Sequence, residues 1–276
     1  MTASNLTRRV ITALVAVGIV IPALIWSAYG MWLFCFIVSM VSLWEFFRAL
    51  GIQKRSYYVI GLSGGLVIWL VCLLRIAVSG LVEMPAAALL IPALLILPAL
   101  ELFALFDKSM KTPGQLLGAV TLGYIYCYLP FFLFFQLAVP EIVEQYDFRL
   151  PLGILWLTWT LDVFAYFIGR FFGKRPLFLR ISPKKTWEGA VGSAIACLGM
   201  GWLMQTLLAP QGYSWLIIAS IICIFSQLGD LVESMFKRSV HLKDSGGILP
   251  GHGGMLDRFD GMFFSLLFIY FYFLVK

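Results

Sequence analysis

The sequence predicts an all-α polytopic membrane protein with about nine transmembrane helices and a cytoplasmic N-terminus. Of its 276 residues, 61% are hydrophobic and 12% are charged, and soluble domains do not have that composition. The apolar residues also fall into runs of about 20, the length that crosses a bilayer core as a helix. Basic residues gather in alternate connections between these runs. We therefore expect one integral membrane domain over residues 1–276, without a separate soluble domain.

The apolar runs place the nine predicted helices in order along the chain. Their expected ranges are 10–29, 31–49, 57–77, 82–106, 115–138, 152–172, 189–208, 213–236 and 257–275. The first run follows Arg8 and Arg9 as a signal peptide would, but it is long for one and more spans follow, so we expect it to be retained.

The orientation follows from the positions of the basic residues. With the N-terminus inside, only Arg75, Arg149 and Lys276 of the 20 Lys and Arg residues fall outside, as the positive-inside rule requires. The polar loops 173–188 and 237–256 then face the cytoplasm. The net charge of +6 reports this topology, and we expect no nucleic-acid partner.

Several features have ordinary structural explanations. All five cysteines lie within apolar runs without paired spacing, which is typical of buried packing residues. In the apolar half, residues 1–150, we interpret Glu45 mainly as an interfacial carboxylate, with support of a site as the alternative. Three prolines, Pro85, Pro92 and Pro98, are expected to kink the fourth helix. Such a kink could admit a lipid, and packing irregularity is an equal alternative.

Two polar segments open the second half, residues 151–276. On a helix, Asp162, Tyr166 and Arg170 recur every four residues and share one face. The following run, SPKKTWEG from Ser182 to Gly189, predicts a short turn rich in donors before the seventh helix. Such a turn suits polyanion binding, while anchoring of a cytoplasmic loop explains it equally well.

The densest polar stretch runs from Ser226 to Asp260. Asp230, Glu233 and Lys237 share a helix face at the inner end of the eighth span, and Asp257 and Asp260 begin the ninth. Carboxylates from two helix ends, with cations nearby, can hold magnesium and substrate phosphates. A salt-bridge network closing the two helices is the alternative. Between them lies a glycine-rich loop containing His252, which could contact phosphate or pyrophosphate, whereas His241 is interpreted as loop surface.

These residues resemble a known family. The run S-x-x-K-R-x-x-x-x-K-D-x-G-x-x-L-P-G-H-G-G-x-x-D-R-x-D, from Ser234 to Asp260, is similar to the signature of phosphatidate cytidylyltransferase, also called CDP-diacylglycerol synthase. The upstream segments Asp162–Lys174 and Ser182–Gly189 resemble the same family, in the expected order. The resemblance is dense over the last 115 residues or so, and the N-terminal half matches only as a run of apolar helices.

The resemblance implies that CTP and phosphatidate react to give CDP-diacylglycerol and pyrophosphate, with Mg²⁺ as cofactor. It also implies a homodimer in a bacterial inner membrane, with the active site near the cytoplasmic face and the lipid substrate in the bilayer. Carried onto this chain, the metal ligands are Asp230 and Asp257, supported by Asp260. The other catalytic residues are Lys237, Arg238, Lys243, Asp244, His252 and Arg258. The substrate-binding residues are Asp162, Tyr166, Arg170, Ser182, Lys184, Lys185, Thr186 and Glu188.

Two other functions remain open from the sequence. A CTP-dependent lipid kinase would use the same substrates and transfer phosphate alone. A transporter also uses charges inside the membrane, but here the charges gather at one face, and no inverted repeat is visible.

Overall fold

The computed structural model describes residues 15, 17–52, 55–78, 113–139, 146–208, 212–248 and 253–276. Within these ranges, seven helical segments are long and apolar enough to cross a membrane, which confirms the predicted all-α membrane class. They are α2 (Ala28–Ala49), α3 (Arg55–Ala77), the continuous run α5 (Pro113–Gly123), η2 (Tyr124–Tyr128) and α6 (Leu129–Ala138), α7 (Arg149–Phe172), α8 (Trp187–Leu208), α9 (Trp215–Ser239) and α10 (Leu256–Val275).

The remaining two predicted spans fare differently. The first, 10–29, contains a shorter apolar helix, Val17–Trp26, which ends before Ser27. The Ser27 hydroxyl caps α2 by accepting a hydrogen bond from Gly30 N, so the break between the first two helices comes a few residues earlier than expected. The fourth span, 82–106, with its three prolines, lies outside the described residues.

The chain divides into two compact units. The first comprises Met1–Phe148 and Asp244–Arg258, and the second comprises Arg149–Lys243 and Phe259–Lys276. The predicted division near residue 150 is close to the first of these boundaries. However, the glycine-rich loop and the first turn of α10 belong with the N-terminal helices.

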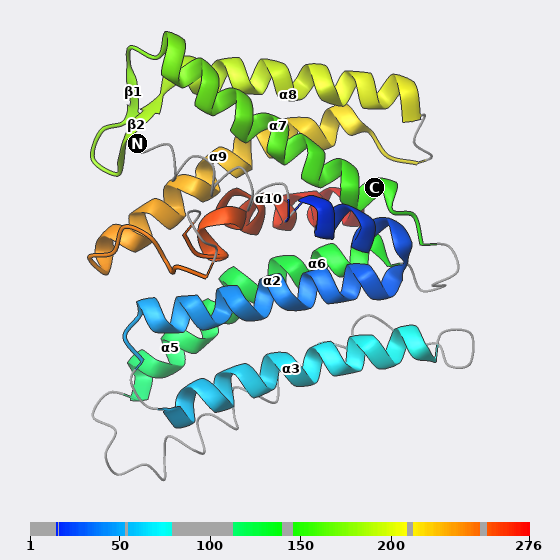
Figure 1. Cartoon of the computed structure of the whole chain (residues 1–276), viewed down its shortest axis with the longest axis vertical. Helices are drawn as coiled ribbons and strands as arrows, with labels where there is room; N and C mark the ends of the chain where they lie inside the picture. Colours follow the sequence, from blue (N-terminus) through cyan, green and yellow to red (C-terminus); the bar gives the residue numbers. More distant parts are fainter. Residues whose placement is uncertain are drawn as a thin grey trace. The chain divides into compact units, whose positions relative to one another are not determined.

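In the first unit, α2 is the central helix and packs against α3, α5, η2 and α6 (Figure 1). Its buried face is rich in aromatic residues, including Phe46 and Phe47. Trp69 of α3 donates from Nε1 to Ser39 Oγ on α2 at 2.9 Å. Such pairing is what a buried indole N–H requires, and it fixes α3 against α2.

One span of this unit contains a π-helical turn. Leu129 N donates to Tyr124 O, five residues back, at the end of η2. Pro130 follows directly and has no N–H with which to continue the α-helical ladder. We therefore attribute the wider turn to the proline, which leaves the span helical on both sides.

In the second unit, α7 and α8 run side by side (Figure 1). Glycines bring the two helices close: a Cβ at Gly189 would lie 3.0 Å from Ala165 O and 3.1 Å from Gly169 Cα. Small residues at helix contacts are typical of membrane packing. Further along the chain, α9 packs on α8, and Phe225 of α9 stacks on Phe268 of α10 with ring centroids 3.4 Å apart.

A small β-hairpin joins α7 to α8. Strand β1 (Pro176–Phe178) pairs antiparallel with β2 (Ser182–Thr186). The turn predicted at Ser182–Thr186 is wrong, because this segment is the second strand. The hairpin is held to α8 by Trp187 N, which donates to Arg175 O at 2.9 Å.

The end of α9 explains the backbone of His241. Leu242 N donates to Lys237 O at 2.8 Å, and His241 N donates to Arg238 O at 3.2 Å. These two bonds form a Schellman motif, which places its C′ residue in the left-handed region. His241 takes that position with φ 57°, and its side chain is exposed, as predicted for a loop surface.

Candidate functional site

Five charged side chains meet in the second unit, and we call them the lysine–carboxylate cluster. Strand β2 carries Lys185, α9 carries Asp230, Glu233 and Lys237, and α10 carries Asp260. The spacing on α9 follows the helical repeat, so its three residues share one face, as predicted. The cluster therefore gathers segments that are far apart in the sequence.

Hydrogen bonds and ion pairs link these side chains. Lys185 Nζ forms an ion pair with Asp230, and Ser234 Oγ donates to Asp230 Oδ1 at 3.4 Å. Lys237 Nζ lies 3.3 Å from Glu233 Oε1, and Glu233 is fully buried. Asp260 lies close to Glu233 and within electrostatic range of Asp230 and Lys185. The side chains of the cluster thus hold one another in place.

The charge of this cluster determines what it can bind. Three carboxyl groups face two ammonium groups, so one carboxyl group in this partly buried setting is either protonated or needs a further cation. An excess carboxylate beside apolar helices attracts a cation, because buried charge is stable only when it is paired. Two of the carboxylates, Asp230 and Asp260, are half-buried rather than sealed. The lysines of the cluster suit phosphate oxygens.

The hairpin side of the unit is ordered by Glu188 and Thr186. Glu188 Oε2 accepts hydrogen bonds from Lys174 N at 3.0 Å and Arg175 N at 3.2 Å. Thr186 Oγ1 accepts from Gly189 N at 3.2 Å, which caps the start of α8. Both residues were predicted to bind substrate. Their observed partners are backbone amides, so their visible function is to shape the basic segment after α7.

Helix α7 presents its predicted polar face. Arg170 Nη1 donates to Tyr166 OH at 2.7 Å, and its guanidinium lies 5.9 Å from the centroid of the same ring. Both side chains are exposed, as is Asp162 two turns before Arg170. The predicted common face is confirmed for Tyr166 and Arg170, which hold each other's orientation.

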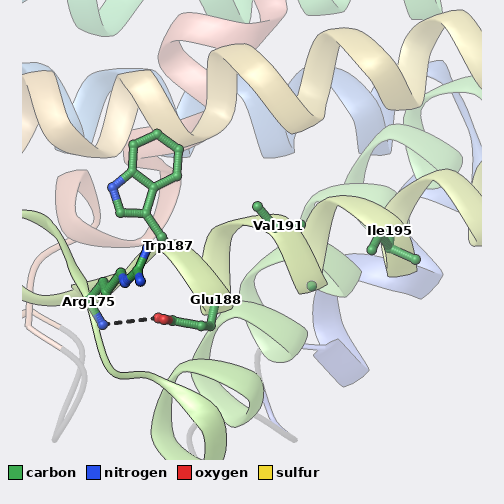
Figure 2. Close-up of a pocket in the computed structure, with 6 residues that line it drawn as sticks. Arg175, Trp187, Glu188, Val191 and Ile195 are labelled. Atoms are coloured by element: carbon green, nitrogen blue, oxygen red, sulfur yellow. Dashed lines mark hydrogen bonds between the residues drawn. The ribbon is translucent and has the colours of Figure 1, made fainter.

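An open groove of about 680 Å³ lies at the start of α8 (Figure 2). Arg175 and Glu188 line its polar end, and Trp187, Val191 and Ile195 line the rest. Figure 2 shows the hydrogen bond from Arg175 N to Glu188 at this end. Because the lining is mostly apolar, the groove suits a hydrocarbon chain better than a polyphosphate.

In the first unit, Asp257 contacts the described parts of the glycine-rich segment, residues 244–248 and 253–256, which we call the signature loop. Its Oδ2 accepts hydrogen bonds from Ser245 N and Gly254 N, each at 2.9 Å, and Oδ1 accepts from Ser245 N at 3.2 Å. Gly253, which lies against the Asp257 carboxylate in space, has φ 87°, a conformation that favours glycine. Asp257 therefore ties both ends of the described loop to the first turn of α10.

Glu45 differs from its main sequence interpretation. Expected mainly as an interfacial carboxylate, it is instead fully buried. Its Oε2 accepts from Leu256 N at 2.9 Å and from Ser245 Oγ at 3.4 Å. The alternative interpretation, support of a site, is the one that the structure favours.

The other predicted residues lie at the edges of these arrangements. Arg238 Nη1 donates to Leu242 O at 3.1 Å and so reinforces the end of α9. Lys184, Lys243, Asp244 and Arg258 are exposed, and Ser182 is half-buried in β2. Within the described ranges, no ion pair joins Lys184, Lys243 or Asp244 to the cluster. His252 lies outside the described residues. Asp230 and Asp257, the predicted metal ligands, belong to different units.

Two residues of these networks were absent from the predicted site. Glu233 shares a helix face with Asp230 and Lys237, and this spacing was visible in the sequence. Glu45 is a lone carboxylate in an apolar span, which is often a functional residue, but its place near the end of the span also fits an interfacial carboxylate. The hydrogen-bond partners of Glu45 lie 200 and 211 residues away, which no local pattern reveals.

The chain is similar to known proteins along its whole length. Residues 7–275 match the Cytidylyltransferase family. The chain is 32% identical over 273 residues to the phosphatidate cytidylyltransferase of Bacillus subtilis (strain 168), covering 97% of both chains. It is 33% identical over 270 residues to that of Staphylococcus saprophyticus, covering 94% of this chain and 95% of the relative. The Brucella abortus biovar 1 enzyme of the same name is 43% identical over 128 residues, 46% of this chain and 47% of the relative.

Proposed function

This chain belongs to the cytidylyltransferase family, and we propose that it transfers CMP from CTP to phosphatidate, giving CDP-diacylglycerol and pyrophosphate for phospholipid biosynthesis. The observation that carries this proposal is the match to enzymes of that name over 97% of both chains. The charged residues clustered at the ends of apolar helices support it, because the reaction joins a membrane lipid to a soluble nucleotide.

The chemistry needs no nucleophile from the protein. A phosphate oxygen of phosphatidate attacks the α-phosphorus of CTP and forms the new P–O bond. The bond from the α-phosphorus to the bridging oxygen breaks, and its electron pair leaves with pyrophosphate. Catalysis of such transfers is mostly positioning and charge neutralisation. The main obstacle is repulsion between two polyanions, which is strong in a weakly polar site.

Magnesium is the proposed cofactor, with Asp230 and Asp257 as ligands and Asp260 supporting. The donors fit a hard cation, since Mg²⁺ is commonly held by one or two carboxylates together with substrate phosphates. The described residues contain no group of three or more His, Cys, Asp and Glu side chains arranged for a metal, so the proposal needs substrate phosphates to complete the coordination. The ammonium of Lys185 on Asp230 supports a preference for positive charge there. Bound magnesium would neutralise charge on the phosphates of CTP.

The basic residues have proposed roles toward the phosphates. Lys237, Arg238, Lys243 and Arg258 contact phosphate oxygens, and Asp244 and His252 act beside them on the pyrophosphate side. The nucleotide and lipid phosphate are bound by Asp162, Tyr166, Arg170, Ser182, Lys184, Lys185, Thr186 and Glu188. The support differs among them: Lys237 is held by a buried carboxylate, and Arg170 is held by Tyr166, so both cations are oriented before substrate arrives.

The cellular setting is part of the proposal. The distribution of basic residues supports an orientation with the reactive groups on the cytoplasmic side, where CTP is present. The bacterial sources of the relatives support a bacterial inner membrane. A homodimer is proposed on the family resemblance alone. Crosslinking in native membranes tests it, and a species of a single chain under all conditions would contradict it.

The test is a transfer assay with purified protein in detergent, phosphatidate, Mg²⁺ and CTP labelled in the cytidine. We expect cytidine label in the lipid phase, release of pyrophosphate, and complete inhibition by EDTA. Parallel CTP labelled in the γ-phosphate identifies a lipid kinase, which would move only that label to lipid. Label in neither lipid product from folded protein would contradict an enzymatic function on these substrates.

Two variants give this assay its controls. Asp257→Asn should remove most transfer activity while the protein stays folded, because the amide keeps the shape but not the charge. Gly199→Ala on α8 is the matched control, since a Cβ there meets nothing within 4 Å, and it should retain full activity. Full activity in folded Asp257→Asn would contradict the metal assignment.

A further inference from the structure

Glu45 is a buried carboxylate that the proposed reaction does not use directly. It lies in the last two turns of α2, is fully buried, and has Leu256 N and Ser245 Oγ as hydrogen-bond donors to Oε2. Its other oxygen, Oε1, makes no hydrogen bond of normal geometry among the described residues, and the backbone N–H of Met255 lies near the carboxylate. A buried, half-satisfied carboxylate lowers stability. Its presence therefore calls for a benefit other than stability.

The signature loop is built closely around this carboxylate. A Cβ at Gly254 would lie 2.5 Å from Glu45 Oε2 and 2.6 Å from Oε1, and a Cβ at Gly246 would overlap Oε1. These distances are shorter than real contacts of a Cβ atom, so a side chain at either position would displace the Glu45 carboxylate or the loop. The loop and the carboxylate therefore fit each other as one packed unit.

Ser245 connects Glu45 to Asp257. Its hydroxyl donates to Glu45 Oε2 at 3.4 Å, while its backbone N–H donates to Asp257 Oδ2 at 2.9 Å. Glu45 also accepts from Leu256 N, the residue directly before Asp257. Glu45 thus holds both Ser245, which donates to Asp257, and Leu256, which precedes Asp257 in the chain. A carboxylate at the first turn of a helix is also favoured by the helix dipole.

We propose that Glu45 is a positioning residue for the nucleotidyl transfer: it holds the signature loop and the first turn of α10 so that Asp257 is presented in its reactive orientation. This inference rests on the proposed function for its consequence in catalysis. It does not require Glu45 to touch substrate or metal. Loss of a residue that orients a ligand of a reactive centre typically costs about 10- to 100-fold in metal affinity or activity.

The kinetic test compares Glu45→Ala, Glu45→Gln and a matched control. Ser42→Ala is the control, because Ser42 is buried one turn earlier on α2 and its hydroxyl has no hydrogen-bond partner among the described residues. For Glu45→Ala we expect kcat per folded enzyme to fall about 10- to 100-fold and the Mg²⁺ requirement to rise. Glu45→Gln should keep most of the activity, because its amide oxygen can accept both bonds of Oε2. Ser42→Ala should match the parent.

A spectroscopic test follows the loop without relying on activity. All five native cysteines are buried, whereas Gly247 is exposed, and a Cβ at this position would meet nothing within 4 Å. A spin label on Gly247→Cys therefore reports the motion of the loop. We expect sharper electron paramagnetic resonance lines in the Glu45→Ala background than in the parent. Glu45→Gln and Ser42→Ala should keep the spectrum of the parent.

Each result supports or overturns the proposal. Parent-like kcat and spectrum in folded Glu45→Ala would overturn it. Loss of activity in Glu45→Gln equal to that in Glu45→Ala, with an unchanged spectrum, would also overturn it, because the charge itself would then be required. If the parent transfers no cytidine to lipid, the proposed function fails. The spectra then still decide whether Glu45 holds the loop.

Discussion

Replacing Gly246 with alanine tests the fit between the signature loop and Glu45. The new Cβ would overlap Glu45 Oε1 and lie 2.8 Å from its Cδ, so the loop and the carboxylate cannot both keep their places. Overpacking of this kind typically costs about 1–3 kcal/mol. That energy corresponds to a decrease of about 5- to 150-fold in the population with the native loop, and we expect transfer activity to fall by a similar factor.

The assay is cytidine transfer to lipid at saturating Mg²⁺, and Gly247→Ala is the control. Neither glycine has a positive φ, and a Cβ at Gly247 meets nothing within 4 Å, so the two substitutions differ in the contact with Glu45. In the double variant Glu45→Ala with Gly246→Ala, the clash disappears, so the second substitution should cost little. Equal losses in the two glycine variants, or full additivity with Glu45→Ala, would refute the reasoning.

Three further predictions concern the second unit. Gly189→Ala should destabilise the protein by about 1–3 kcal/mol, because the new methyl group separates α7 from α8. Gly199→Ala should be neutral or stabilising by up to about 1 kcal/mol. Thermal unfolding in detergent compares the stabilities of the two variants. His241→Gly should stabilise by about 0.5–1 kcal/mol, because left-handed strain exceeds the entropy cost of glycine, and an unchanged melting temperature would contradict this. Lys185→Met should lower the Mg²⁺ concentration for half-maximal activity about two- to fivefold, because the ammonium no longer competes with the cation at Asp230. A Mg²⁺ titration at fixed CTP measures this concentration, and a higher value in the variant would contradict the prediction.

The membrane fold was predictable because each span is visible in the sequence as a run of about 20 apolar residues. Seven of the expected spans correspond to helices in the ranges that the structure describes, since about 20 apolar residues have no stable alternative in a bilayer. The cysteines were likewise predicted correctly as buried packing residues. These inferences needed only local sequence, which determines whether a segment is apolar and how long it is.

The hairpin was not predictable for the opposite reason. Strands of three and five residues, containing Pro176 and Pro183, carry too little periodicity to indicate a sheet. Their stability comes from the Glu188 side chain, which binds the amides of Lys174 and Arg175, and from Trp187 N, which binds Arg175 O. These contacts bring together residues 12 to 14 positions apart in a fold that already exists.

Glu45 shows how the two halves of the chain share one task. Its sequence context resembles that of any carboxylate near the end of a span. Its role appears only when Asp244–Arg258 is seen to belong with the N-terminal helices. The glycines at positions 246 and 254 are then explained, because a side chain at either position would occupy the space that the Glu45 carboxylate fills. In a buried polar network, paired groups stabilise one another and an unpaired group is destabilising. Removal of one partner should therefore loosen the whole loop. The apolar half, which resembles the family only as a run of apolar helices, therefore contributes directly to the order of the reactive segment.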